Sequence, residues 1–198
     1  MNTIKTYIVI LFSLFLLQDT FAQRDGQYLS DSDFKLSAFG DYMIEFSFLG
    51  DELGVSTGGG IAALFNQSWY IGGYRLSSAN DITVFNDLGI SSTVNYQHTG
   101  LWVGYFFTPK QLVHIGFSAK GGWGSMSFDG VTAFEDNLFA ITPQLEANVN
   151  IARWCRLGFG AGYRITTGVD NPFYTAQDFN SPVGTVNIMI GWFGQNTY

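Results

Sequence analysis

The two histidines, His98 and His114, are the residues of this sequence best suited to acid-base chemistry. A histidine can activate a serine when an acidic side chain orients its ring. Ser91, Ser92 and Glu135 are conceivable partners for His98, but no spacing among these residues is diagnostic of a catalytic motif. We therefore expect both histidines to form hydrogen bonds inside the fold, and we assign no catalytic residue.

No motif in the sequence indicates a metal, a cofactor or a nucleic acid. The net charge is -7, and no run of Lys and Arg could neutralise a phosphate backbone. Cys155 is the only cysteine, which excludes an intrachain disulfide and a cysteine-based zinc cluster. The triplet Gly58-Gly59-Gly60 lacks the Lys-Ser/Thr ending of a phosphate-binding loop and is expected to mark a bend or a close contact between strands. We predict no cofactor, no metal site and no nucleic-acid partner.

The elements that carry these residues are predicted from alternating apolar and polar positions. In residues 138–151 and 155–166 every second residue is apolar, while the others are mostly polar or glycine and include Arg156 and Arg164. A period of two is typical of a β-strand whose two faces differ. Six further segments complete a set of eight predicted strands: 41–48, 55–65, 69–77, 96–107, 112–123 and 183–193.

The composition and the strand lengths indicate that lipid surrounds these strands. Charged residues make up 13% of the chain, against roughly 25% in an average soluble domain. Several predicted strands approach the roughly 9 to 11 residues that a tilted transmembrane strand needs, and strands can cross a bilayer only as a closed barrel. The predicted fold is all-β, an eight-stranded antiparallel up-and-down transmembrane β-barrel. A soluble periplasmic barrel that binds an apolar ligand, with the two faces reversed, is an alternative.

The charged residues of the strands share the polar face. An Arg or Lys pointing at lipid near the midplane costs about 2 to 4 kcal/mol, so the polar face is expected to enclose the lumen. An eight-stranded barrel has room for side chains and little else, and buried ions must be paired. We predict a structural charge network in the lumen, to which Arg75 is a further candidate: Glu45, Lys120, Glu146, Arg156 and Arg164.

The connections alternate between short and long, as they do in outer-membrane barrels. Short links are expected at 66–68, 108–111 and 150–154, and long loops at 78–95, 124–136 and 168–182. The link at 50–53 is an exception, because it is short where a long loop is expected. Whether the acidic residues of the long loops bind cations is left open.

The amino terminus resembles an export signal. Lys5 precedes the apolar run 7–17, and Thr20-Phe21-Ala22 forms a small-residue cleavage site. The expected organisation is a signal peptide over residues 1–22, a short segment over 23–34 and the barrel over 35–198. Aromatic side chains are expected to form belts at the two membrane interfaces: Tyr70, Tyr74, Trp102, Tyr105, Trp154, Tyr163, Trp192 and Phe193.

Several motifs carry a resemblance to known barrels. They are Tyr70-Ile71-Gly72-Gly73-Tyr74, Trp102-Val103-Gly104-Tyr105, Val113-His114, the glycine-rich run 158–164 and the closing Gly191-Trp192-Phe193, together with the triplet at 58–60. The architecture resembles the small eight-stranded outer-membrane barrels typified by OmpX and the OmpA membrane domain, and the motifs resemble a family of uncharacterised exported β-barrel proteins. The resemblance implies no catalytic or ligand-binding residues. It leaves open whether Phe193 or Tyr198 is the terminal aromatic residue that the barrel assembly machinery recognises.

We therefore expect an outer-membrane protein with a filled lumen, a structural or surface-interaction role and no catalysis. Its expected partners are outer-membrane lipid and the barrel assembly machinery, together with an external partner of the loops that the sequence does not identify. The alternative that needs chemistry is an enzyme that modifies envelope lipids, which would place His98 or His114 beside a serine or an acid.

Overall fold

The chain forms a β-barrel. The computed structural model describes residues 35–49, 52–80, 82–85, 91–129, 134–168 and 176–193, all of which belong to one compact unit, Lys35–Tyr198. The predicted signal peptide and the segment 23–34 lie outside the described residues. The elements are β1 (Leu36–Leu49), β2 (Glu52–Phe65), β3 (Trp69–Ser78), β4 (Ile82–Phe85), β5 (Ser91–Phe106), β6 (Val113–Asp129), β7 (Phe134–Ala152), β8 (Cys155–Thr167), a single-turn 3-10 helix η2 (Ala176–Phe179) and β9 (Ser181–Gly191).

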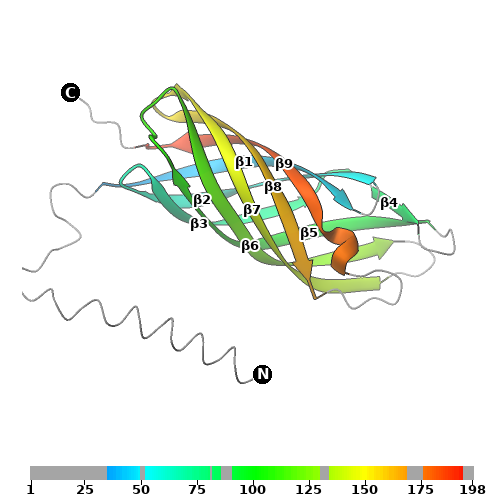
Figure 1. Cartoon of the computed structure of the whole chain (residues 1–198). Coiled ribbons are helices and arrows are strands. Elements are labelled where there is room, and N and C mark those ends of the chain that lie inside the picture. Colours follow the sequence, from blue (N-terminus) through cyan, green and yellow to red (C-terminus); the bar gives the residue numbers. More distant parts are fainter. Residues whose placement is uncertain are drawn as a thin grey trace, which may run out of the picture. The chain divides into compact units, whose positions relative to one another are not determined.

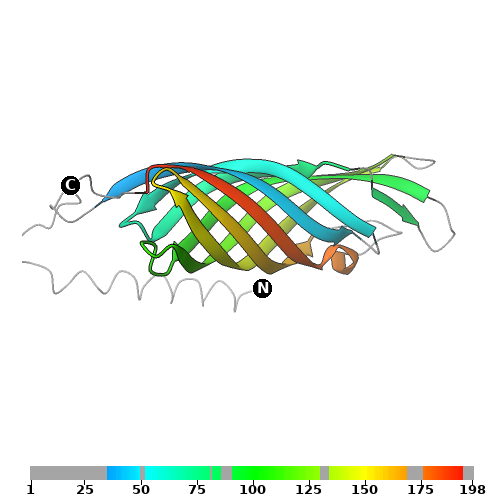
Figure 2. The ribbon, with the colours of Figure 1, turned by 90° about the horizontal axis from the view of Figure 1, so that it is seen from above.

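Eight of these strands form a closed antiparallel ring (Figures 1 and 2). Each strand pairs with the next along the chain, β9 returns to pair with β1, and β3 pairs with β5. The short strand β4 pairs with the start of β5, beyond the point where β3 ends, so it continues the line of β3. The predicted fold class and strand number are confirmed. Closure gives every strand of the ring two neighbours, which is what a bilayer requires of its backbone.

Short turns join the strands at the barrel end that also holds Lys35 and Phe193. The link between β2 and β3 places Asn66 and Gln67 at φ 50° and 66°, and the Ser68 amide donates to the Phe65 carbonyl at 3.1 Å. Two consecutive positive φ angles characterise the tight hairpin turn that matches the twist of antiparallel strands, and Asn tolerates them well. This end is the one expected to face the periplasm.

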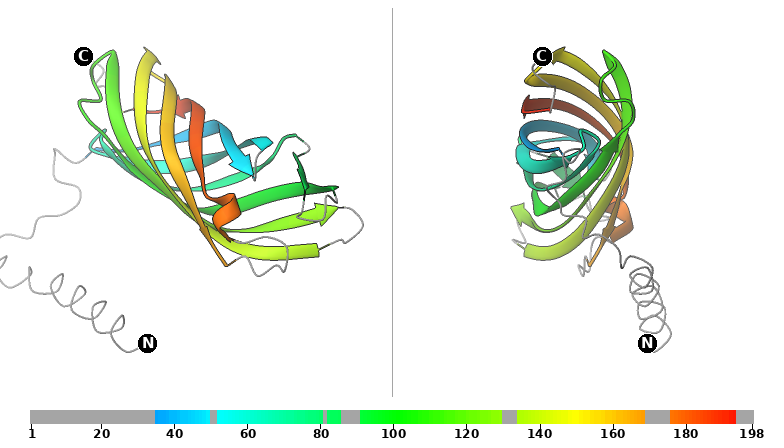
Figure 3. Two further views of the ribbon diagram at one scale, coloured as in Figure 1. Left: turned by 45° about the vertical axis from the view of Figure 1, so that its right-hand side comes forward. Right: turned by 90° about the vertical axis from the view of Figure 1, so that its left-hand side faces the viewer.

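At the opposite end the strands are longer than predicted. β6 continues to Asp129 and β7 begins at Phe134, so most of the segment 124–136, predicted as a loop, is strand. The segment 78–95 likewise contains β4 and the start of β5. The prediction was wrong here because polar residues on a strand beyond the apolar band have the same composition as a loop. Figure 3 shows this extension of β5, β6 and β7.

The two faces of the barrel differ as the alternation predicted. On β7, Leu145 is 68% exposed and Ile141 45% exposed, whereas their neighbours Gln144 and Glu146 are each 3% exposed. β1, β6, β8 and β9 follow the same rule. The reversed faces of a soluble barrel with an apolar lumen are therefore contradicted, because residues that would line that lumen point outward.

The glycine triplet on β2 allows close contact between strands. A β-carbon on Gly58, Gly59 or Gly60 would collide with a backbone carbonyl of β3 or β1. The predicted close contact is confirmed, and it explains why larger residues are absent from this part of the wall.

No helix within the described ranges is long and apolar enough to cross a membrane.

Candidate functional site

The most polar part of the lumen is an ion-pair cluster formed by Glu45, Lys120 and Arg164, here called the charge cluster. The Lys120 Nζ lies 2.5 Å from the Glu45 Oε2, and an Arg164 guanidinium nitrogen lies 3.5 Å from the Glu45 Oε1. All three side chains are at most 2% exposed. They reach one another from β1, β6 and β8, strands far apart in the sequence. One carboxylate thus bridges two cations in a space closed to solvent.

Neutral oxygens complete the surroundings of Arg164. Its guanidinium donates to the Ser47 hydroxyl at 3.0 Å, to the Phe48 carbonyl at 3.2 Å and to the Phe179 carbonyl of η2 at 3.3 Å. Its Cζ also lies 4.9 Å from the centre of the Tyr96 ring. A planar group with five N–H donors suits such a mixed set of partners. Arg164 therefore ties β1, β8 and η2 together at the loop end of the lumen.

His98 lies within this packed region. The Tyr74 hydroxyl and the His98 Nδ1 share a hydrogen bond of 2.9 Å, and the Tyr96 ring lies 4.9 Å from the imidazole, centre to centre. His98 is 1% exposed. The expected role in interior hydrogen bonding is confirmed, because the ring is enclosed and its Nδ1 is engaged by a tyrosine.

The lumen toward the short turns is lined by an aromatic group, here called the aromatic cluster: Phe39, Tyr70, Trp102, Phe106 and Phe193. Tyr70 and Trp102 meet edge to face with centroids 4.7 Å apart. The Arg156 Cζ lies 4.0 Å from the Phe193 ring centre and 5.0 Å from that of Phe106. Cations over aromatic faces are attracted by the ring quadrupole. Arg156 is 1% exposed, so this end of the lumen is closed as well.

The structure brings together some of the predicted site residues and separates others. Glu45, Lys120 and Arg164 meet, while the Glu146 Oε1 accepts a hydrogen bond of 2.5 Å from Ser118. Within the part of the chain that the structure describes, Arg156 pairs with no carboxylate. Arg75 is exposed on the outward face, so it does not belong to the lumen.

The prediction of aromatic belts was half wrong. Trp154 and Trp192 are 60% and 76% exposed, as predicted, and Tyr163 also faces outward. On β3 and β5 both faces carry apolar residues or glycine, so the sequence did not show which face their aromatic residues take. Four of the eight residues expected in the belts are instead buried in the lumen: Tyr70, Tyr74, Trp102 and Phe193.

Sequence reasoning also missed residues that complete the lumen. Ser47 and Tyr96 contact Arg164, and Tyr74 contacts His98. Their alternation with outward residues was a usable signal for position, but nothing in the sequence shows which lumen residues meet across the barrel.

No catalytic arrangement occurs among the described side chains. His114 is 3% exposed, and its Nδ1 lies 3.3 Å from the Gln111 carbonyl oxygen. The side chains of Ser91, Ser92 and Glu135 lie outside those described. The described residues also contain no group of three or more His, Cys, Asp or Glu side chains that could hold a metal ion.

Comparison with known proteins shows the fold. No protein-family model and no curated protein matches the chain, so the resemblance to an uncharacterised exported family stays a prediction. Among solved structures, the chain is similar to the Neisserial surface protein A, with a TM-score of 0.51, 14% identity and coverage of 80% of this chain and 97% of that chain. The attachment invasion locus protein Ail of Yersinia pestis is similar at a TM-score of 0.48 and 13% identity, over 79% of this chain and 97% of its own. The likeness to the neisserial protein confirms that this chain has the fold of the small eight-stranded outer-membrane barrels.

Proposed function

We propose that this chain is an outer-membrane β-barrel with a filled lumen and a structural or surface-interaction role, without catalysis. The observation that carries the proposal is the contrast between the two faces of the wall. Ile61, Leu145 and Ile188 are 75%, 68% and 41% exposed on the outside, while the ion pairs lie inside. Exposed apolar surface on this scale needs lipid to cover it.

The filled lumen argues against conduction. The charge cluster blocks the loop half of the barrel, and the aromatic cluster with Arg156 blocks the turn half. An eight-stranded ring is just wide enough for such side chains. The barrel is therefore proposed to act through its surfaces and not as a channel.

The extended strands at the loop end support an interaction role. β7 begins at Phe134 and pairs with β6 from there, but its first pair with β8 is Phe139 with Thr167. β6 and β7 thus extend beyond β8 at the loop end of the barrel, where they add surface that a partner outside the membrane can contact.

The proposal includes export and assembly. Residues 1–22 would be removed as a signal peptide, and the barrel would be inserted by the assembly machinery of the outer membrane. The aromatic residues directly after β9 are Trp192, which is 76% exposed, and Phe193, which is buried. The described residues do not include Tyr198.

Heat-dependent gel mobility tests the proposal. The full chain, expressed with its amino terminus, should be recovered in the outer-membrane fraction and should migrate differently before and after boiling, because a closed barrel resists detergent. Recovery of the mature chain as a detergent-free soluble protein, with no shift on boiling, would contradict it.

A further inference from the structure

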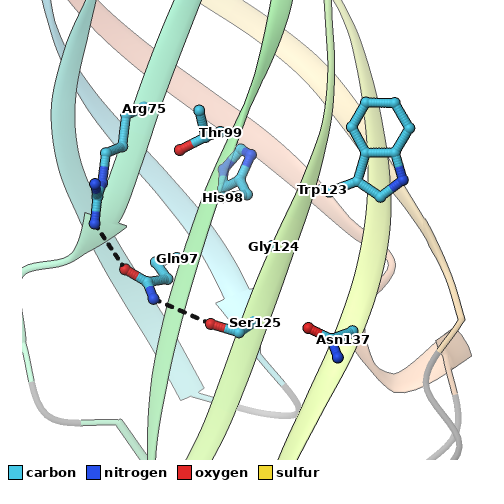
Figure 4. Close-up of a pocket in the computed structure, with 8 residues that line it drawn as sticks. All are labelled: Arg75, Gln97, His98, Thr99, Trp123, Gly124, Ser125 and Asn137. Carbon is cyan, nitrogen blue, oxygen red and sulfur yellow. Dashed lines mark hydrogen bonds between the residues drawn. The ribbon is translucent and has the colours of Figure 1, made fainter.

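A row of polar side chains crosses the outer wall on β3, β5 and β6. Figure 4 shows a hydrogen bond from Arg75 to Gln97 and another from Gln97 to Ser125. Thr99 and Trp123 line the same pocket. Arg75 donates to the Gln97 Oε1 at 3.1 Å, and the Gln97 Nε2 donates to the Ser125 Oγ at 3.0 Å. These residues line an open depression of about 310 Å³ in the wall.

The two hydrogen bonds within the row leave several of its donors available to a ligand. Ser125 accepts from Gln97, so its hydroxyl proton remains available, as do the Thr99 hydroxyl and most of the five N–H groups of Arg75. Among the described side chains of β3, β5, β6 and β7, Arg75 is the only cation that faces outward. The set therefore offers one fixed positive charge with several donors, which suits an anion.

The row lies directly above the apolar band. Leu101 is 63% exposed on β5, and Thr99 and Gln97 follow it at the next two outward positions. A strand rises about 3.3 Å per residue, so at a tilt of about 40° two residues gain about 5 Å in height. The headgroup layer occupies about 5 to 8 Å on each side of the hydrocarbon. Arg75 is paired with Thr99 in register, so it falls within that layer.

The neighbouring aromatic residue marks the same level. Trp123 is 71% exposed and packs against Phe139 with ring centres 5.1 Å apart. Exposed aromatic residues gather at membrane interfaces, where one edge of the ring is apolar and the other is wet. The depression therefore opens toward lipid headgroups and not toward bulk solvent alone.

We infer that the row formed by Arg75, Gln97 and Ser125 binds the phosphate headgroup of an outer-leaflet lipid. A guanidinium can bind two phosphate oxygens at once, and the hydrogen bond to the Gln97 Oε1 holds it in place. The Ser125 and Thr99 hydroxyls can donate to the remaining oxygens. The inference rests on the proposed membrane location, but it adds a specific lipid site that the proposed function does not require.

The test uses the full-length protein reconstituted in vesicles. The midpoint of thermal unfolding is followed in phosphatidylcholine alone and with increasing diphosphoryl lipid A, because a ligand that binds the folded state raises the midpoint. Arg75→Gln is the test variant. Arg153→Gln is the matched control, since Arg153 is also exposed but lies in the turn between β7 and β8, at the other end of the barrel.

For the wild type we expect lipid A to raise the midpoint, and for Arg75→Gln we expect apparent lipid A affinity about 10-fold weaker, as for the loss of one charged hydrogen bond. Arg75→Lys should retain part of the affinity, and Arg153→Gln should bind as the wild type does. An unchanged response of Arg75→Gln, or an equal loss in Arg153→Gln, would overturn the inference. A rise of equal size with inorganic phosphate alone would show a site for soluble anions and would overturn it as well.

Failure of the proposed function gives a different result. If the wild type does not float with phosphatidylcholine vesicles, the membrane location itself is wrong. If the wild type and Arg75→Gln float equally and only the lipid A response is missing from both, the lipid site alone is wrong.

Discussion

The two halves of the lumen are closed by different kinds of interaction. Toward the loops, the charge cluster sets Glu45 between two cations, at 2.5 Å from Lys120 and 3.5 Å from Arg164. Toward the turns, Arg156 is buried with no described carboxylate partner and lies 4.0 Å from the Phe193 ring centre. The same kind of side chain, a buried arginine, is thus accommodated by charge pairing at one end and by aromatic rings at the other.

Because the two halves are closed differently, removal of one charged side chain should affect the stability of each half differently. In the charge cluster, loss of the anion leaves two cations in a space without solvent. In the turn half, loss of the Arg156 cation leaves the rings of the aromatic cluster, which still pack against one another. The loop half should therefore be sensitive to a single charge, while the turn half should lose only packing.

The largest effect is expected from Glu45→Ala. We expect the free energy of unfolding to fall by about 3 to 5 kcal/mol, because Lys120 and Arg164 lose their shared carboxylate. Urea unfolding of the barrel in vesicles, followed by tryptophan fluorescence, measures it. The control is the double variant Glu45→Gln with Lys120→Met. Its free energy of unfolding should fall by less than that of Glu45→Ala. An equal loss in the two variants would mean that the ion pair is not what holds this half together.

The next effect concerns the outer wall. Ile141→Arg should destabilise the barrel in vesicles by about 2 to 4 kcal/mol, because the new charge faces lipid, whereas Ile141→Ala should cost far less. Alternation alone suggests Thr142→Arg as a mild comparison, but Thr142 is 1% exposed and is the cross-strand partner of Lys120. An arginine there would crowd the charge cluster. Equal stability of Ile141→Arg and Ile141→Ala would contradict the assignment of this face to lipid.

Arg156→Met probes the turn half. We expect the free energy of unfolding to fall by about 1 to 2 kcal/mol, since a cation over aromatic rings is replaced by an apolar chain of similar length. The same urea titration measures this change. A loss as large as that of Glu45→Ala would remove the contrast between the two halves and would indicate an ionic partner for Arg156.

The smallest effect is expected from Tyr74→Phe. The change removes the hydroxyl that lies 2.9 Å from the His98 Nδ1 and keeps the ring, so the expected loss is about 1 kcal/mol. The chemical shifts of the His98 imidazole should change, while those of His114 should not. Unchanged His98 shifts would show that this hydrogen bond does not form in the membrane.

Sequence reasoning worked where the two faces of a strand differ in chemistry. On β7 and β8 every charge of the predicted strands shares one parity, and the structure buries Glu146, Arg156 and Arg164 accordingly. On β3 and β5, both faces carry apolar residues or glycine, so Tyr70 and Trp102 were assigned to the interface although they fill the lumen. Alternation cannot show which face points inward when the two faces are chemically alike.

The pairing of lumen residues lay beyond the sequence for a different reason. Glu45 and Arg164 are brought together by the tilt and closure of the ring, which set the height of each strand against the others. Alternation fixes only whether a residue points in or out. The polar row at Arg75 was missed because it lies above the apolar band, where an outward residue no longer has to be apolar.

The central claim is that the apolar face meets acyl chains while the charged face is enclosed. Spin labels provide the most direct test, with Leu145→Cys on the wall and Trp154→Cys in a short turn, each in a Cys155→Ser background and reconstituted in vesicles. The label at Leu145 should collide readily with oxygen and hardly at all with an aqueous nickel chelate, and the label at Trp154 should collide more with the chelate. A label at Leu145 that is as accessible to the nickel chelate as the one at Trp154 would contradict the account.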